Sequence, residues 1–148
     1  MTLEEKIVQT LQDRDIDFEI CKHEPVYTNP TMATALGVSE AETVKSLVLT
    51  TKEKALVVLV MPGNKKVDWK DAARTVNTKK VSFAKPEAVS AAVGCEVGCV
   101  PPFGHKTKLP IYMDADLLQQ TYVYFNPGVH HKSFKVSSRD LQKLCRAG

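Results

Sequence analysis

Two apolar runs lie close together in VKSLVLTTKEKALVVLVM, residues 44–61. The run at 55–61 is apolar at every position, which is typical of a strand covered on both faces of a sheet. The run at 44–51 indicates a second strand, and the polar segment 51–54 between them predicts a hairpin loop. We therefore place a hairpin here, with its second strand in the centre of a sheet.

Signals for helices lie on both sides of this hairpin. Thr2 and Glu5 have the spacing of a capping box, and the apolar residues that follow them recur at helical spacing. Ser39 and Glu42 form another box, which predicts one or two turns. Further helices are predicted at 30–37, 69–76, 86–94 and 138–145. Proline, aspartate or serine marks where each of these helices begins, and glycine marks where two of them end.

Short strands are expected at 18–22, 80–83, 97–100, 109–113 and 121–125, with a last strand that ends at Val136. Strands and helices are interspersed, but several strand pairs have tight connections. This order favours an α+β fold, in which a mixed, largely antiparallel β-sheet or partial barrel is flanked by helices. No linker or repeat divides the 148 residues, so we expect one domain over 1–148.

Composition excludes several classes of protein. Hydrophobic residues make up 43% and charged residues 25%, as in an average globular domain. The longest apolar run is the size of a strand, and the first six residues contain no apolar signal region, so we expect a cytoplasmic protein without a membrane partner. The net charge of +3 does not by itself establish nucleic-acid binding, but it permits contact with one RNA end.

The four cysteines are Cys21, Cys95, Cys99 and Cys145. Three residues separate Cys95 from Cys99, instead of the two that are typical of zinc or redox pairs, so we expect no metal and no cofactor. The sequence also lacks a Gly-x-Ser-x-Gly elbow, a Walker loop and a Gly-x-Gly-x-x-Gly fingerprint. A pair of nucleophilic cysteine and histidine stays open as an alternative.

Lys45 is the most informative polar residue. Side chains alternate along a strand, so Lys45 shares a face with Leu47 and Leu49. If those leucines face the core, the ammonium points toward a pocket that could hold an anion. In the alternative, the other face of the strand is inside and Lys45 lies in solvent.

Two loops could line such a pocket. In GCVPPFG, residues 98–104, the prolines restrict the backbone and the glycines relax it, so the loop could form a pocket wall or simply turn a corner. In NPGVHH, residues 126–131, Gly128 would let backbone N–H groups approach an oxyanion. His130 could donate, accept or carry a proton near neutral pH, or lie on the surface without a role.

Five segments in this order resemble the YbaK/ProX family, which also includes the editing domain inserted in bacterial prolyl-tRNA synthetases. They are VKSLV at 44–48, GCEVGCVPPFG at 94–104, LPIYMD at 109–114, NPGVH at 126–130 and SSRDL at 137–141. The resemblance covers nearly the whole chain, and it implies the YbaK/prolyl-tRNA synthetase-associated domain fold.

The resemblance also implies an activity, which is hydrolysis of the ester between a wrong amino acid and the 3′ adenosine of transfer RNA. It implies catalytic roles for Lys45 and His130, with Lys45 holding the terminal phosphate or the substrate. The substrate-binding positions that it implies are Gly98, Cys99, Pro101, Gly104, Asn126 and Gly128. The implied partners are the 3′ acceptor end of the tRNA and prolyl-tRNA synthetase or another synthetase.

The pair of Gly128 and His130 resembles the alanine-editing branch of the family. The expected substrate is therefore tRNA(Pro) that carries a small amino acid, alanine before cysteine or serine. Cys99 stands where glycine or alanine is often found, which leaves the size of the pocket open. Two other readings remain: a non-catalytic module that binds an RNA end or nucleotide, and a small-molecule hydrolase with Cys99 as its nucleophile.

Overall fold

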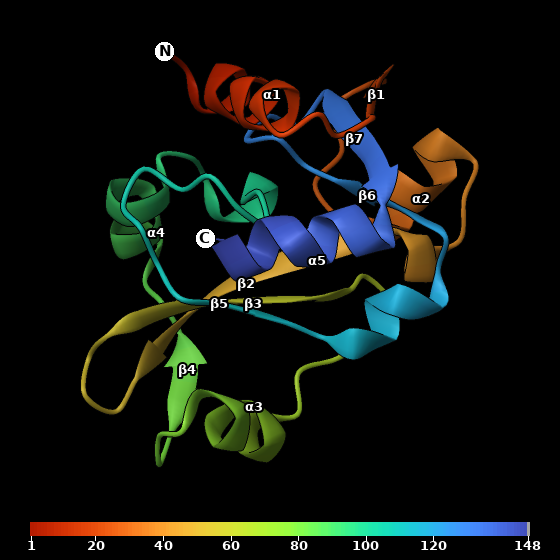
Figure 1. Cartoon of the computed structure of the whole chain (residues 1–148). Helices are drawn as coiled ribbons and strands as arrows, with labels where there is room; N and C mark the ends of the chain where they lie inside the picture. Colours follow the sequence, from red (N-terminus) through yellow and green to blue (C-terminus); the bar gives the residue numbers. More distant parts are fainter. Residues whose placement is uncertain (148) are drawn as a thin grey trace.

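Two β-sheets lie at the centre of the computed structural model, which describes residues 1–147 (Figure 1). The helices are α1 Leu3–Asp13, α2 Asn29–Leu36, α3 Trp69–Val76, α4 Pro86–Val93 and α5 Ser138–Ala147, with short 3₁₀ turns η1 Glu40–Glu42, η2 Val97–Cys99 and η3 Ala115–Gln119. The strands are β1 Glu19–Lys22, β2 Val44–Thr51, β3 Leu56–Pro62, β4 Val81–Phe83, β5 Ile111–Met113, β6 Tyr122–Phe125 and β7 Lys132–Ser137.

One sheet has the strand order β4-β2-β3-β5, and the other has the order β1-β7-β6. All neighbours are antiparallel except β3 and β5, which are parallel. A bridge from Thr43 to Tyr124 brings the start of β2 beside β6. The predicted α+β class and the mixed, largely antiparallel pairing are confirmed, but the strands form two sheets and do not close into a barrel.

The hairpin at 44–61 is confirmed as β2 and β3. Its register pairs Val44 with Pro62 and Thr50 with Leu56, and β3 lies between β2 and β5 as predicted. The capping box at Thr2 is present, since its hydroxyl accepts from the Glu5 N–H while the Glu5 carboxylate accepts from the Thr2 N–H. These contacts are local in sequence, which is why sequence reasoning finds them.

Both faces of the β2–β3 hairpin are covered by apolar packing. The larger core includes Val44, Val48 and Val58 and extends to α1, α4 and α5. The smaller core lies on the opposite face, where Leu49 and Val57 pack with Ala72 and Ala73 of α3. The hairpin therefore separates the α3 end of the molecule from the rest.

The predicted strand at 97–100 is wrong. Residues Val97–Cys99 form the 3₁₀ turn η2, in which the Cys99 N–H donates to Glu96 O at 3.2 Å. The two valines favour a strand, but Gly98 between them does not, and no neighbouring strand pairs with this segment in residues 1–147. Within residues 1–147, no helix is both long and apolar enough to cross a membrane.

Candidate active site

His130 lies in the connection between β6 and β7, where backbone pairing fixes its position. The Val26 N–H donates to His130 O at 3.0 Å, and the His23 N–H donates to His131 O at the same distance. This pairing prolongs the β1–β7 ladder by a few residues. It also directs the His130 ring toward Val26 O, which lies 3.1 Å from Nδ1.

The second ring nitrogen of His130 faces a carboxylate. Nε2 lies 3.0 Å from Glu96 Oε2, so both ring nitrogens face acceptors and the protonated ring can satisfy both. Burial is the largest single influence and opposes the charge on the ring, but the hydrogen bond to Glu96, the charge of Cys99 and the hydrogen bond to Val26 O together raise the pKa of His130 above its ordinary value. The ring is 17% exposed whereas the Glu96 side chain is 79% exposed, so the carboxylate can move away when a ligand arrives.

A small residue and an aromatic ring flank His130. A Cβ atom built on Gly98 would lie 3.4 Å from His130 Cε1, so the absence of a side chain leaves this edge of the ring uncovered. The Tyr27 ring lies on the other side, with 4.4 Å between the ring centroids, and Tyr27 is 67% exposed. The site therefore has room for a small group at the imidazole edge.

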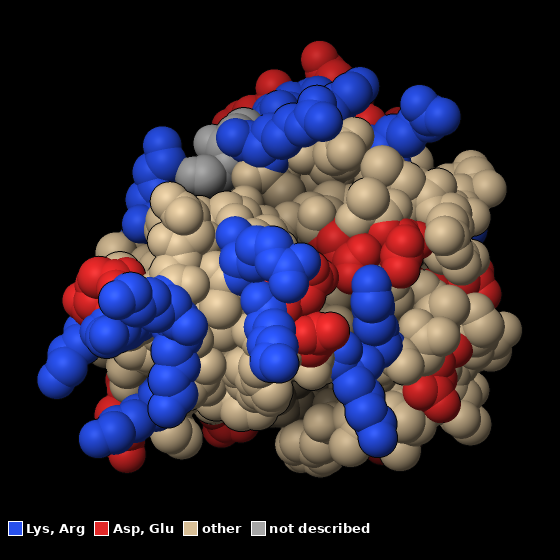
Figure 2. All heavy atoms as spheres, turned by 90° about the horizontal axis from the view of Figure 1, so that it is seen from below, with Lys and Arg blue, Asp and Glu red and all other residues tan. Residues whose placement is uncertain are grey.

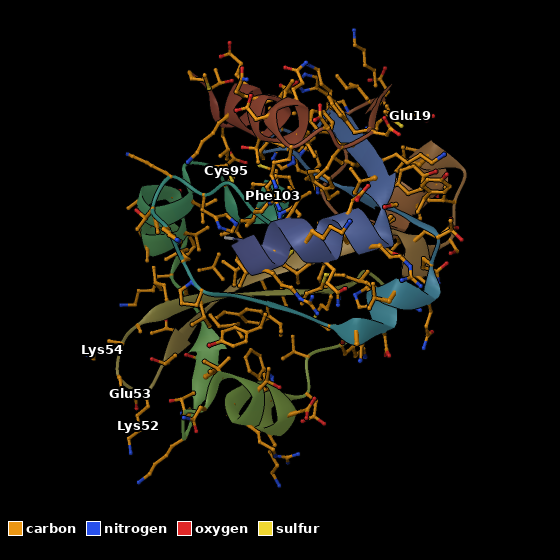
Figure 3. The ribbon with its side chains drawn as sticks, in the orientation of Figure 1. Glu19, Lys52, Glu53, Lys54, Cys95 and Phe103 are labelled. Carbon is orange, nitrogen blue, oxygen red and sulfur yellow. The ribbon has the colours of Figure 1, made fainter. Side chains whose placement is uncertain are left out.

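Two thiols lie on the loop that carries Gly98, and one of them, Cys99, is close enough to His130 for the two charges to interact. Cys95 and Cys99 are hydrogen-bonded to each other, and both lie on the connection between α4 and β5 on which Figure 3 labels Cys95 and Phe103. The hydrogen bond from Cys95 lowers the pKa of Cys99 to about 7, with a further contribution from the charge of His130. The same pairing raises the pKa of Cys95. Cys99 is buried, so it can limit the size of a pocket here.

Two buried side-chain atoms in the described chain have no hydrogen-bond partner. They are Ser46 Oγ and Asn126 Oδ1. Ser46 lies within β2 and Asn126 directly follows β6, and these two strands meet at the bridge from Thr43 to Tyr124. A buried polar atom without a partner costs about 1–3 kcal/mol, so such atoms are candidates for ligand contacts.

Three of the predicted pocket residues face other parts of the protein. Gly128 has φ +94°, and a Cβ built on it would lie 2.9 Å from Leu3 Cδ2 of α1. Gly104 has φ +77° and faces Ile7 of α1 in the same way, at 3.2 Å. Pro101 is buried, and its carbonyl accepts a 2.7 Å hydrogen bond from His105 Nε2. These residues shape the two loops by packing against α1 and the core.

Lys45 lies on the Leu47–Leu49 face of β2, as strand parity predicts. That face carries the smaller core, and the Lys45 ammonium donates to Lys65 O at 2.6 Å. Burial lowers the pKa of Lys45, while the charge of Glu40 partly opposes this effect. No hydrogen bond within residues 1–147 links Lys45 to the 98–104 loop, whose Val100 belongs to the core on the opposite face.

The structure thus brings Gly98, Cys99 and His130 together, and no hydrogen bond among the described residues joins Lys45 to them. Sequence reasoning missed Tyr27, Glu96 and the carbonyl of Val26. These residues lie 34 to 104 positions from His130 in the sequence, so no local sequence pattern could predict their contacts with it. Among the described residues, no cluster of three or more His, Cys, Asp or Glu side chains could hold a metal ion.

The chain is thus a small α+β domain with a histidine site on the connection between β6 and β7. The family model for the aminoacyl-tRNA editing domain matches residues 23–144. The protein therefore belongs to the aminoacyl-tRNA editing domain family, and the predicted resemblance to YbaK/ProX is confirmed.

Named relatives and solved structures agree with this family. The Ser/Thr-tRNA deacylase ProXp-y of Escherichia coli K12 is 23% identical, and the match covers 96% of this chain and 87% of the relative. The prolyl-tRNA editing protein ProX of Acetoanaerobium sticklandii is 24% identical over 99% of this chain and 93% of its own. A crystal structure of a candidate trans-editing enzyme for prolyl-tRNA synthetase superposes with a TM-score of 0.87 at 27% identity, covering 100% and 94% of the two chains. The predicted hydrolase of the aminoacyl-tRNA ester is confirmed at the level of the family.

Proposed function

We propose that this protein is a trans-editing deacylase that hydrolyses the ester of mischarged tRNA(Pro), with alanine preferred to cysteine or serine. The observation that carries the proposal is the His130 ring, held by Val26 O and Glu96 with its edge left open at Gly98. Membership of the editing family supports the reaction, and the names of ProX and ProXp-y support a tRNA substrate. The preference for alanine rests on the resemblance of Gly128 and His130 to the alanine-editing branch.

An aminoacyl ester is already activated, so the site needs to position water and stabilise an oxyanion rather than supply a strong nucleophile. Water adds to the carbonyl carbon, the bond from that carbon to the ribose oxygen breaks, and the proton that the added water loses returns to the imidazole, so the ring ends as it began. In this proposal the Nε2–H of the protonated His130 ring stabilises the oxyanion and then passes its proton to the ribose oxygen. The pKa of His130 is raised above its ordinary value before the substrate binds, which favours this form of the ring. The Glu96 carboxylate, once displaced from Nε2, pairs with the α-ammonium of the amino acid.

The other predicted site residues take supporting roles in this proposal. Gly98 and Cys99 set the space for the amino-acid side chain, and the orphan carbonyl of Asn126 accepts a hydrogen bond from the substrate. Pro101, Gly104 and Gly128 keep the pocket walls in shape. A pocket of fixed size excludes the bulkier proline by volume, although it cannot reject a smaller side chain by a large factor.

Lys45 is proposed to bind the terminal phosphate of the substrate. To do so, Lys45 gives up its hydrogen bond to Lys65 O and donates to the phosphate instead. A hydrogen bond between two charged groups of this kind contributes about 1.5–3 kcal/mol. Lys45→Ala is therefore expected to reduce the rate of deacylation roughly ten- to hundredfold, with little loss of stability. Unchanged turnover in a well-folded Lys45→Ala protein would exclude this role.

The decisive assay is release of amino acid from tRNA(Pro) charged with alanine, cysteine, serine or proline. The proposal predicts release of alanine fastest and no release of proline. Binding of charged tRNA without release of any amino acid would favour a non-catalytic module instead. Loss of all activity in Cys99→Ala with retention in His130→Ala would favour a cysteine hydrolase.

A further inference from the structure

The α3 end of the molecule carries two hollows that share a wall. The first has a volume of about 710 Å³ and lies between the β2–β3 hairpin and α3, with Lys52, Lys70, Arg74 and Lys79 on its walls. The second has a volume of about 430 Å³ and lies between the start of α3 and β4. Lys70 and Lys79 line both, so the two hollows form one continuous face, which we call the α3 face.

The α3 face is strongly basic. Five cationic side chains line its hollows, and Glu53 is the one carboxylate among the lining residues; the cations are Lys52, Lys70, Arg74, Lys79 and Lys80. Glu53 accepts a 2.9 Å hydrogen bond from the Thr78 hydroxyl, and Arg74 has an exposed, 3.7 Å contact with Asp71. Lys52 and Lys54 project from the hairpin tip (Figure 3), and Figure 2 shows several groups of Lys and Arg side chains on this end of the molecule, with Asp and Glu side chains between some of them. The whole chain has a net charge of only +3, so positive charge is concentrated here.

Two exposed aromatic rings lie among these cations. Trp69 is 40% exposed and Phe83 is 59% exposed, and they pack edge to face with 4.9 Å between centroids. Phe83 belongs to β4, which is an edge strand of its sheet. These two rings pack together into one exposed apolar patch rimmed by polar side chains, which is the kind of surface that binds a partner. Nucleobases stack on such rings whatever their sequence, while neighbouring cations bind the phosphates.

We infer that the α3 face binds a strand of RNA, with phosphates along the lysines and an unpaired base against Trp69 and Phe83. The identity of this RNA as the body of the tRNA rests on the proposed function. The α3 face is separate from the His130 site, because α3 packs on the opposite face of the hairpin from the larger core. Lys45 lies on the same side of the hairpin as α3 but does not line either hollow. Figure 1 shows α3 and β4 at one end of the molecule and α1 and the β1–β7 pair at the other.

Trp69 is the only tryptophan, so its fluorescence reports on this face alone. Deacylated tRNA(Pro) is expected to quench that fluorescence in the wild-type protein. The variant Lys70→Ala/Arg74→Ala/Lys79→Ala is expected to bind at least tenfold more weakly, and to lower the slope of log affinity against log salt by roughly 2 to 3, about 0.7–0.9 for each lost phosphate contact. The matched control is Lys22→Ala/Arg139→Ala/Lys143→Ala, which removes the same charges from exposed positions on β1 and α5 and is expected to bind as the wild type does.

Catalysis separates this inference from the proposed function. With charged tRNA, the α3-face variant is expected to raise KM and leave kcat unchanged, and to hydrolyse an aminoacylated CCA trinucleotide as fast as the wild type. If no charged tRNA is hydrolysed, the proposed function fails, while quenching by deacylated tRNA still tests the α3 face. The inference would be overturned if tRNA did not quench the fluorescence, or if the α3-face variant bound tRNA as tightly as the wild type. It would also be overturned if anionic lipid vesicles quenched the fluorescence and RNA did not.

Discussion

Gly98 and Gly128 both belong to the predicted site, but their surroundings differ. Gly98 has no left-handed backbone, and an added methyl group would reach the His130 ring at ordinary contact distance. Gly128 combines φ +94° with a close approach to Leu3. Only the first therefore faces the proposed substrate.

We expect Gly98→Ala to keep the stability of the wild type within about 0.5 kcal/mol and to lose at least tenfold in deacylation, because the methyl group covers the open edge of His130. We expect the opposite result for Gly128→Ala, which loses stability and keeps its activity. Its strained backbone should lower the free energy of unfolding by about 1–3 kcal/mol, with kcat of the folded fraction retained. Urea unfolding and alanine release measure both, and the opposite pattern in the two variants would refute this assignment.

The protonation of His130 gives a second prediction at this scale. The ordinary value for its pKa is 6.5, and the contact with Glu96 raises it in the folded state. The contribution of this pair to stability is therefore fully present below pH 6.5 and is lost as the pH rises through the raised folded-state pKa. Glu96→Gln should lower the pKa of His130, which an NMR titration of the ring Cε1 proton measures; an unchanged pKa would show that Glu96 does not pair with it.

At the scale of elements, α1 holds the two loops of the site in place. Leu3 meets Gly128 and Ile7 meets Gly104, so one face of this helix supports both connections. The capping box at Thr2 fixes where the helix starts and therefore which residues face the loops.

Ile7→Ala should lower the free energy of unfolding by about 2–5 kcal/mol, because Ile7 is fully buried and its loss leaves a cavity against the 98–104 loop. The control Gln9→Ala lies on the exposed side of the same helix and should stay within about 0.5 kcal/mol of the wild type. Denaturant unfolding measures both. Equal effects would mean that α1 does not brace this loop.

Elements whose signals are local could be predicted from the sequence. Thr2, Asp68 and Pro86 mark helix starts, and the apolar run at 55–61 marks the central strand. The face of Lys45 could be assigned by parity, but its environment could not, because each face of the hairpin covers a separate core. The partners of His130 lie on distant loops, and only the pairing of the sheet brings them together.

At the scale of the whole molecule, the β2–β3 hairpin divides two surfaces. One side carries the larger core and the His130 site, and the other carries α3 with its basic face. A tRNA is long enough to meet more than one part of such a small protein. We therefore place the ester chemistry at His130 and binding of the RNA body on the α3 face, with Lys45 on the same side of the hairpin as α3.

The most direct test of the central claim is alanine release from Ala-tRNA(Pro) by the wild type and by His130→Ala under single-turnover conditions. We expect release by the wild type and a rate at least a hundredfold lower in the variant, which is the size of effect that a positioned acid or base supplies. Circular dichroism of His130→Ala serves as the folding control. No release by the wild type, or equal rates in the two proteins, would contradict the account.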